Sequence, residues 1–159
     1  MDDKTSNNRQ YDRYETEAKI FFRVSYSINT IIKFKLLDKI RNKIASRSYS
    51  AMSKNVSAQG VCFTSDKKLN VGDKLLMEVQ LPGGNIGVMM EGEVRWCRED
   101  SDDPQRLNTG VKLFTVNGQD VDSSIHKDPA YNVVWSVVLE SILGNYRIFA
   151  QQRNHLKTP

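Results

Sequence analysis

The sequence has few of the residues from which metal sites, disulfide scaffolds and catalytic centres are built. Its two cysteines, Cys62 and Cys97, form no CxxC or Cys/His spacing, which excludes a typical zinc site or disulfide framework. The two histidines, His126 and His155, lie beside neither a cysteine nor a paired carboxylate. The acidic run at residues 99–103 lacks the glycine and terminal glutamate of an EF-hand, so a solvated hairpin loop is expected there. We therefore predict no enzyme, with no catalytic residues, no metal and no cofactor.

Phosphate-binding loops and long apolar runs are also missing. Gly83, Gly84 and Gly87 do not match GxGxxG, and no GxxxxGK[ST] string occurs. The longest uncharged run, residues 129–139, is far shorter than the roughly 20 apolar residues that span a bilayer. Residues 1–5 lack the apolar stretch of a secretory signal. We expect a cytoplasmic protein without a transmembrane segment.

Basic residues are concentrated in the first part of the chain. The net charge is +4, but residues 1–60 hold 12 Lys or Arg against 6 Asp or Glu, while the remainder holds 11 against 13. Such a basic half suits nucleotide phosphates, nucleic acid, an acidic membrane surface or an acidic partner protein. Charge alone does not choose among them.

The dominant pattern is alternation of apolar and polar residues, which is typical of half-buried strands. It predicts strands at residues 18–26, 49–54, 60–65, 73–81, 86–98 and 108–115. The Pro82–Asn85 string supplies turn chemistry between two of them and predicts a hairpin. Short, regularly spaced strands favour a mainly β fold, either a small antiparallel barrel or a sandwich. Six strands over residues 18–116 suit a six-stranded antiparallel β-barrel, because closure removes exposed edges. Residues 1–17 are polar and are expected to form a flexible N-terminal arm.

Two segments are expected to be helical. Between about residues 28 and 47, apolar residues recur near helical spacing opposite a basic side, which predicts an amphipathic helical insertion. Such a helix would pack on the barrel, lie on an anionic membrane or dock on a partner protein. In the C-terminal segment, residues 117–159, Asp128-Pro129 resembles a helix start and an apolar stripe follows. The Val-rich stretch leaves a strand open as an alternative, and a homodimer through this helix is a hypothesis.

Two short motifs precede and follow the first predicted strand. Arg9-Gln10-Tyr11-Asp12-Arg13 is an RxxxR string on the arm, and Asn55-Val56-Ser57-Ala58-Gln59-Gly60 is an NxSxxG string between two strands. With the downstream strings at residues 92–96 and 109–114, they resemble the PilZ family over about residues 8–116.

The resemblance implies a receptor for the bacterial second messenger cyclic di-GMP. It carries the ligand contacts to Arg9, Arg13, Asn55, Ser57 and Gly60. Arginine forks match phosphate oxygens or a guanine edge and stack on purines. An amide and a hydroxyl suit the bases and phosphates, and glycine allows close approach. Closure of the arm over the ligand would be the conformational signal, passed to a downstream protein partner in motility or biofilm regulation.

Other functions and placements remain open from the sequence. A PilZ-like adaptor that binds a protein but no nucleotide is the main alternative function, and a nucleic-acid-binding small barrel is another. The strands lack the interleaved aromatics that base stacking requires, which disfavours the latter. Trp96 is expected to face the core, with Arg95 and Arg98 on the opposite side and outside the primary site.

Overall fold

The computed structural model describes residues 25–38, 40–81, 87–128 and 133–144. The predicted arm with Arg9 and Arg13 lies outside the described residues, as do residues 18–24 of the first predicted strand. Among the described helical residues, none belongs to a helix that is long and apolar enough to cross a membrane.

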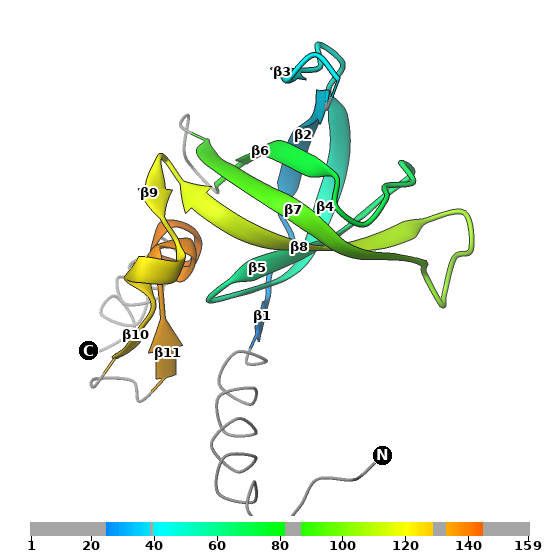
Figure 1. Cartoon of the computed structure of the whole chain (residues 1–159). Coiled ribbons are helices and arrows are strands. Elements are labelled where there is room, and N and C mark those ends of the chain that lie inside the picture. The colour runs from blue at the N-terminus through cyan, green and yellow to red at the C-terminus, as the bar shows by residue number, and fades with distance from the viewer. Residues whose placement is uncertain (1–24, 39, 82–86, 129–132, 145–159) are drawn as a thin grey trace, which may run out of the picture.

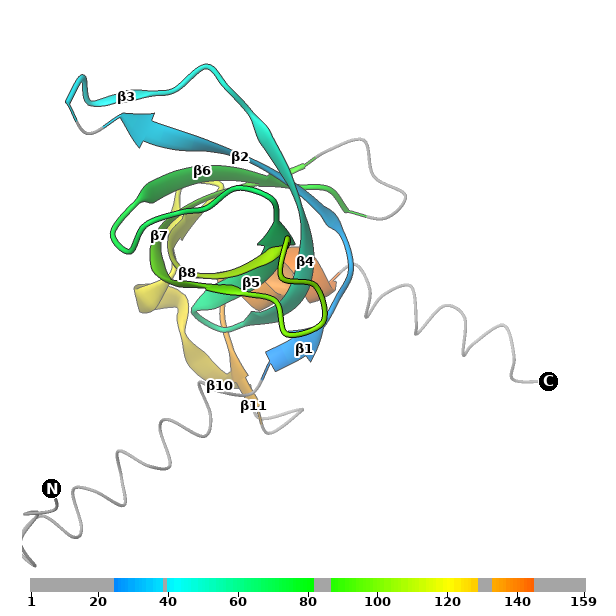
Figure 2. The same ribbon diagram turned by 90° about the vertical axis from the view of Figure 1, so that its right-hand side faces the viewer.

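Six antiparallel strands close into a barrel, seen from the side in Figure 1 and along its axis in Figure 2. Each strand pairs with the next around the ring, and the last pairs again with the first. In this spatial order they are β4 (Tyr49–Ser57), β5 (Gly60–Ser65), β8 (Leu107–Val116), β7 (Val88–Glu99), β6 (Lys74–Val79) and β2 (Ile31–Asp38). The predicted mainly β fold and its six-stranded antiparallel barrel are confirmed. Closure leaves no free edge in the ring.

Five of the predicted strands correspond to ring members. The ranges 49–54, 60–65, 73–81, 86–98 and 108–115 match β4, β5, β6, β7 and β8, with ends that differ by up to three residues. The predicted hairpin is the β6–β7 pair. Only the end of the expected first strand is described: β1 (Ser25–Ser27), which pairs with the last residues of β4.

The prediction of a helical insertion over about residues 28–47 is wrong. The segment holds β2 and the short strand β3 (Lys43–Ile44), which pairs with it. Ile32 and Phe34 are buried in the core, while Ile31 and Lys33 are exposed, which is an alternation of two. β2 occupies the position between β4 and β6 that closes the ring. The hydrogen bonds and burial gained by closure outweigh a helical spacing that the same residues also satisfy.

The inward-facing side chains of the ring form the core. Those with no exposed surface include Ile32, Phe34, Phe63, Met77, Met90 and Leu113. The rings of Phe34 and Phe63 lie 5.1 Å apart between centroids. Full burial of each such side chain contributes about 1.5–3 kcal/mol.

The C-terminal segment folds against the end of the barrel (Figure 1). After β9 (Gln119–Asp120) and the 3-10 turn η2 (Asp122–Ser124), β10 (His126–Asp128) pairs with β11 (Val133–Trp135). Helix is described at residues 137–144, so the C-terminal helix is confirmed, but its predicted start at Asp128 is wrong. The strand alternative holds for the Val-rich residues 133–135. Val138, Leu139 and Ile142 are buried, so the helix packs into the core as expected.

Candidate functional site

The NxSxxG string forms the tight connection between β4 and β5. The hydroxyl of Ser57 accepts a hydrogen bond from the Gly60 amide at 3.2 Å and so closes the turn. A Cβ atom on Gly60 would lie 2.5 Å from the carbonyl oxygen of Val111 in the neighbouring strand. Glycine is therefore required here for close approach of two strands, as expected from its lack of a side chain.

A row of paired residues crosses the outer surface of four strands beside this turn. Asn55 of β4 pairs with Cys62 of β5, which pairs with Gly110 of β8, which pairs with Trp96 of β7. A Cβ atom on Gly110 would lie 2.2 Å from Cε2 of Trp96, so the indole lies directly over this glycine. The row brings a polar amide and an aromatic face onto one surface.

This row is the floor of an open pocket of about 400 Å³. Its volume falls in the range of small-molecule sites. The three described site predictions, Asn55, Ser57 and Gly60, all line it, so the structure brings them together. The remaining lining residues are Ser25, Gln59, Val61, Cys62, Arg95, Trp96, Gly110, Val111 and Lys112.

The expectation that Trp96 faces the core is wrong. The pairing of β7 with β8 shifts between Val94 and Trp96, which is a β-bulge. Because an extra residue changes the face on which the following side chains lie, Trp96 moves to the outer surface and Cys97 turns inward toward Thr109. Trp96 is half-buried, and the Arg98 guanidinium lies 4.6 Å from its ring centroid. A pattern of alternation alone cannot reveal the bulge.

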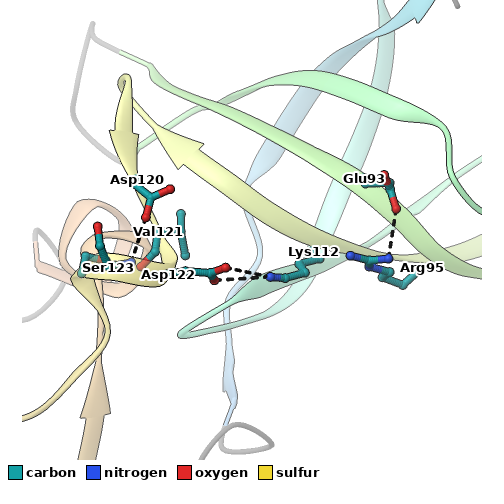
Figure 3. Close-up of polar contacts among 8 residues, drawn as sticks. Glu93, Arg95, Lys112, Asp120, Val121, Asp122 and Ser123 are labelled. Atoms are coloured by element: carbon teal, nitrogen blue, oxygen red, sulfur yellow. Dashed lines mark hydrogen bonds and ion pairs between the residues drawn. The ribbon is translucent and has the colours of Figure 1, made fainter.

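Two cations that the sequence did not assign to the site line the pocket, and each is paired with a carboxylate (Figure 3). Arg95 lies 3.0 Å from Glu93, and Lys112 lies 3.2 Å from Asp122. The side chains of Arg95 and Asp122 are 50% and 60% exposed, so both pairs are partly solvated and individually weak. An anion that enters the pocket can therefore compete for these cations at small cost. The GEVRW and GVKLF strings contain Arg95 and Lys112, which is the signal that could have identified them.

Burial determines the direction in which the pKa of the Cys62 thiol, on the pocket floor, is shifted. It raises the pKa of Cys62 above its ordinary value of 9.0, while the nearby charges of Lys54 and Arg98 act in the opposite direction. The thiol therefore stays neutral at neutral pH and adds no negative charge that would repel an anionic ligand. Among the described residues, no group of three or more His, Cys, Asp or Glu is placed to hold a metal ion.

The C-terminal segment is attached directly to the NxSxxG turn. The hydroxyl of Ser136 donates to the Ala58 carbonyl at 2.7 Å, and the same oxygen accepts from the Val138 amide at 3.1 Å at the start of the helix. Ser136 is 1% exposed. One buried hydroxyl thus joins the turn that lines the pocket to the first turn of the helix.

A second attachment runs from Lys112 to Asp122 in η2 (Figure 3). The η2 turn is ordered by the Asp120 carboxylate, which accepts from the Ser123 amide at 2.8 Å. That hydrogen bond lowers the pKa of Asp120 below its ordinary value of 3.8. Buried Val121 anchors the same turn to the core.

Comparison with known proteins identifies the family. No curated protein sequence matches the chain. Among solved structures, the Bacillus subtilis inhibitor of motility, MotI/DgrA, is similar with a TM-score of 0.49 and 12% sequence identity. The match covers 86% of this chain and 52% of that protein, so the chain spans about half the length of this structural relative. The sequence profile of the PilZ domain matches residues 7–126, and the chain therefore belongs to the PilZ family of cyclic di-GMP-binding domains.

Proposed function

We propose that this chain is a cyclic di-GMP receptor without catalytic activity, which passes ligand binding to a partner protein through its C-terminal segment. The observation that carries the proposal is the pocket in which Asn55, Ser57 and Gly60 meet Trp96 and two cations on one outer surface. An amide, an aromatic face and basic side chains are the groups that a compact dianion with two guanines requires.

Each group has a physical role toward such a ligand. The amide oxygen of Asn55 accepts from the N1 and N2 donors of a guanine. The indole of Trp96 offers a face for stacking once the Arg98 guanidinium, which lies 4.6 Å from its ring centroid, moves aside. Arg95 and Lys112 exchange their carboxylate partners for phosphate oxygens. Arg9 and Arg13 add guanidinium forks from the arm, where lysine would not replace their bidentate and stacking contacts.

The contacts of the C-terminal segment support a route for the signal. Phosphate binding to Lys112 weakens its pair with Asp122, and movement of the NxSxxG turn acts on Ser136 through the Ala58 carbonyl. Both changes bear on the segment that leads into the helix. A ligand that favours one arrangement of these contacts shifts the population of the segment toward it.

Calorimetric titration with cyclic di-GMP tests the proposal. We expect saturable binding that is lost in Arg13→Ala and weakened in Asn55→Ala. Arg106→Ala is the matched control, because Arg106 is an arginine that pairs with Asp66 and does not line the pocket. Absence of binding by the wild-type protein would exclude the receptor and favour an adaptor that binds a protein partner without nucleotide.

A further inference from the structure

The β2–β3 hairpin extends beyond the barrel (Figures 1 and 2). β2 pairs with the ring through Leu36, whereas Leu37 and Asp38 pair only with β3. The turn has its own local support: the Asp38 carboxylate accepts from the amides of Ile40 and Arg41 at 2.9 and 3.2 Å. These two hydrogen bonds order the turn residues Ile40 and Arg41 beyond the end of the ring.

This hairpin and its flanking residues account for the net positive charge of the chain. Residues 31–47 include six Lys or Arg and one Asp, a net charge of +5. The other 142 residues hold 17 basic and 18 acidic residues, a net charge of −1. Within the described part of the chain, neither Arg41 nor Lys43 forms an ion pair. These cations are available to an external anionic surface.

Apolar side chains are exposed between the cations at the tip. Ile40 is 96% exposed in the turn, and Ile44 on β3 is 45% exposed. An exposed isoleucine side chain has no favourable interaction with water or with an ion. Its burial is favourable at the boundary between lipid headgroups and acyl chains, where neighbouring cations can also contact phosphates.

We propose that the β2–β3 hairpin docks on an anionic lipid surface. Ile40 and Ile44 enter the headgroup boundary, and Arg41 and Lys43 contact lipid phosphates. The same positive charge would also attract a nucleic acid, but the tip at residues 40–44 contains no aromatic side chain on which a base could stack. The exposed isoleucines favour lipid.

The position of the hairpin leaves the pocket accessible. β4 begins at Tyr49 beside the hairpin and ends at Ser57 in the NxSxxG turn, so the two features lie at opposite ends of one strand (Figure 1). Lipid docking and cyclic di-GMP binding are therefore compatible, and the failure of either would not imply failure of the other.

Vesicle co-sedimentation with the full chain tests the proposal. At about physiological ionic strength, we expect binding to vesicles of phosphatidylglycerol mixed with phosphatidylcholine and none to phosphatidylcholine alone. Ile40→Ser should weaken binding about tenfold, because one inserted side chain is lost. Arg41→Gln and Lys43→Gln should each weaken it about fivefold.

Matched controls lie elsewhere on the surface. Val71→Ser removes an apolar side chain that is 68% exposed, and Arg106→Gln removes a charge from the β7–β8 loop, and neither should change vesicle binding. Equal binding by Ile40→Ser and the wild type would overturn the proposal, since charge alone would then explain attachment. Failure to bind the anionic vesicles would also overturn the proposal and would favour an acidic protein partner. The same holds if the chain binds a single-stranded oligonucleotide more tightly than the vesicles and Ile40→Ser leaves that binding unchanged, which would favour a nucleic acid.

Discussion

Alanine at Gly110 should separate ligand binding from stability. The added Cβ would meet the indole of Trp96 at 2.2 Å, well inside van der Waals contact. Trp96 is a half-buried side chain on the outer surface, so it can swing away while the strands keep their places. Alanine at Gly60 would instead clash with backbone, because its Cβ would lie 2.5 Å from the carbonyl oxygen of Val111. A paired strand would have to move.

The two variants therefore differ in the quantity that they change. Gly60→Ala should lower the free energy of unfolding by about 1–3 kcal/mol, the usual range for overpacking. At 2–4 °C for each kcal/mol, its Tm should fall by roughly 2–12 °C. Gly110→Ala should leave Tm within roughly 3 °C. If Trp96 stacks on a guanine, its displacement should cost about 1–3 kcal/mol of binding, or roughly five- to 150-fold in Kd.

Thermal unfolding followed by circular dichroism, together with calorimetric titration of cyclic di-GMP, measures both quantities. Gly92→Ala is the control for strand crowding, because its Cβ would lie 2.5 Å from the Lys112 carbonyl oxygen on the buried side of β7. It should lose stability as Gly60→Ala does, because a paired strand would have to move in both variants. Equal affinity of Gly110→Ala and the wild type for cyclic di-GMP would exclude stacking of Trp96 on a guanine. Unfolding of Gly110→Ala as early as Gly60→Ala would show that the indole does not move aside.

Three further predictions concern the contacts around the pocket. Ser136→Ala leaves the buried Ala58 carbonyl without its donor and removes a helix cap, so urea unfolding should show a loss of about 1–3 kcal/mol; an unchanged midpoint would contradict the proposed attachment. Asp122→Asn frees Lys112 for the ligand, and calorimetry should show cyclic di-GMP binding tightened by roughly two- to fivefold, whereas weaker binding would argue against competition for this cation. Because the pKa of Cys62 is raised, the unfolded thiol loses its proton first, so this group's contribution to stability falls as pH rises through and above about 9. The drop in stability between pH 8 and 10 should accordingly be smaller in Cys62→Ala than in the wild type, and equal drops would exclude a role for this thiol.

Features that depend on local chemistry could be predicted from the sequence. Alternation at β4 to β8 predicted the strands because neighbouring side chains of a strand lie on opposite faces. The resemblance of the NxSxxG string to the PilZ motif predicted a site at Asn55, Ser57 and Gly60, and these residues line one pocket because they belong to one turn. The roles of Arg9 and Arg13 stay predictions, since these residues lie outside the described part of the chain.

Features that depend on pairing between distant strands could not be predicted from the sequence. The apolar residues from Ile31 to Ile44 are compatible with both a helical and a strand period. β2 forms a strand because it can pair with β4 on one side and with β6 on the other. The bulge that turns Trp96 outward arises from the register of β7 against β8, so no pattern within β7 predicts it. Residues 133–135 became a strand because β10 was available as a partner. In each case the deciding hydrogen bonds join segments whose relative positions exist only after the chain has folded.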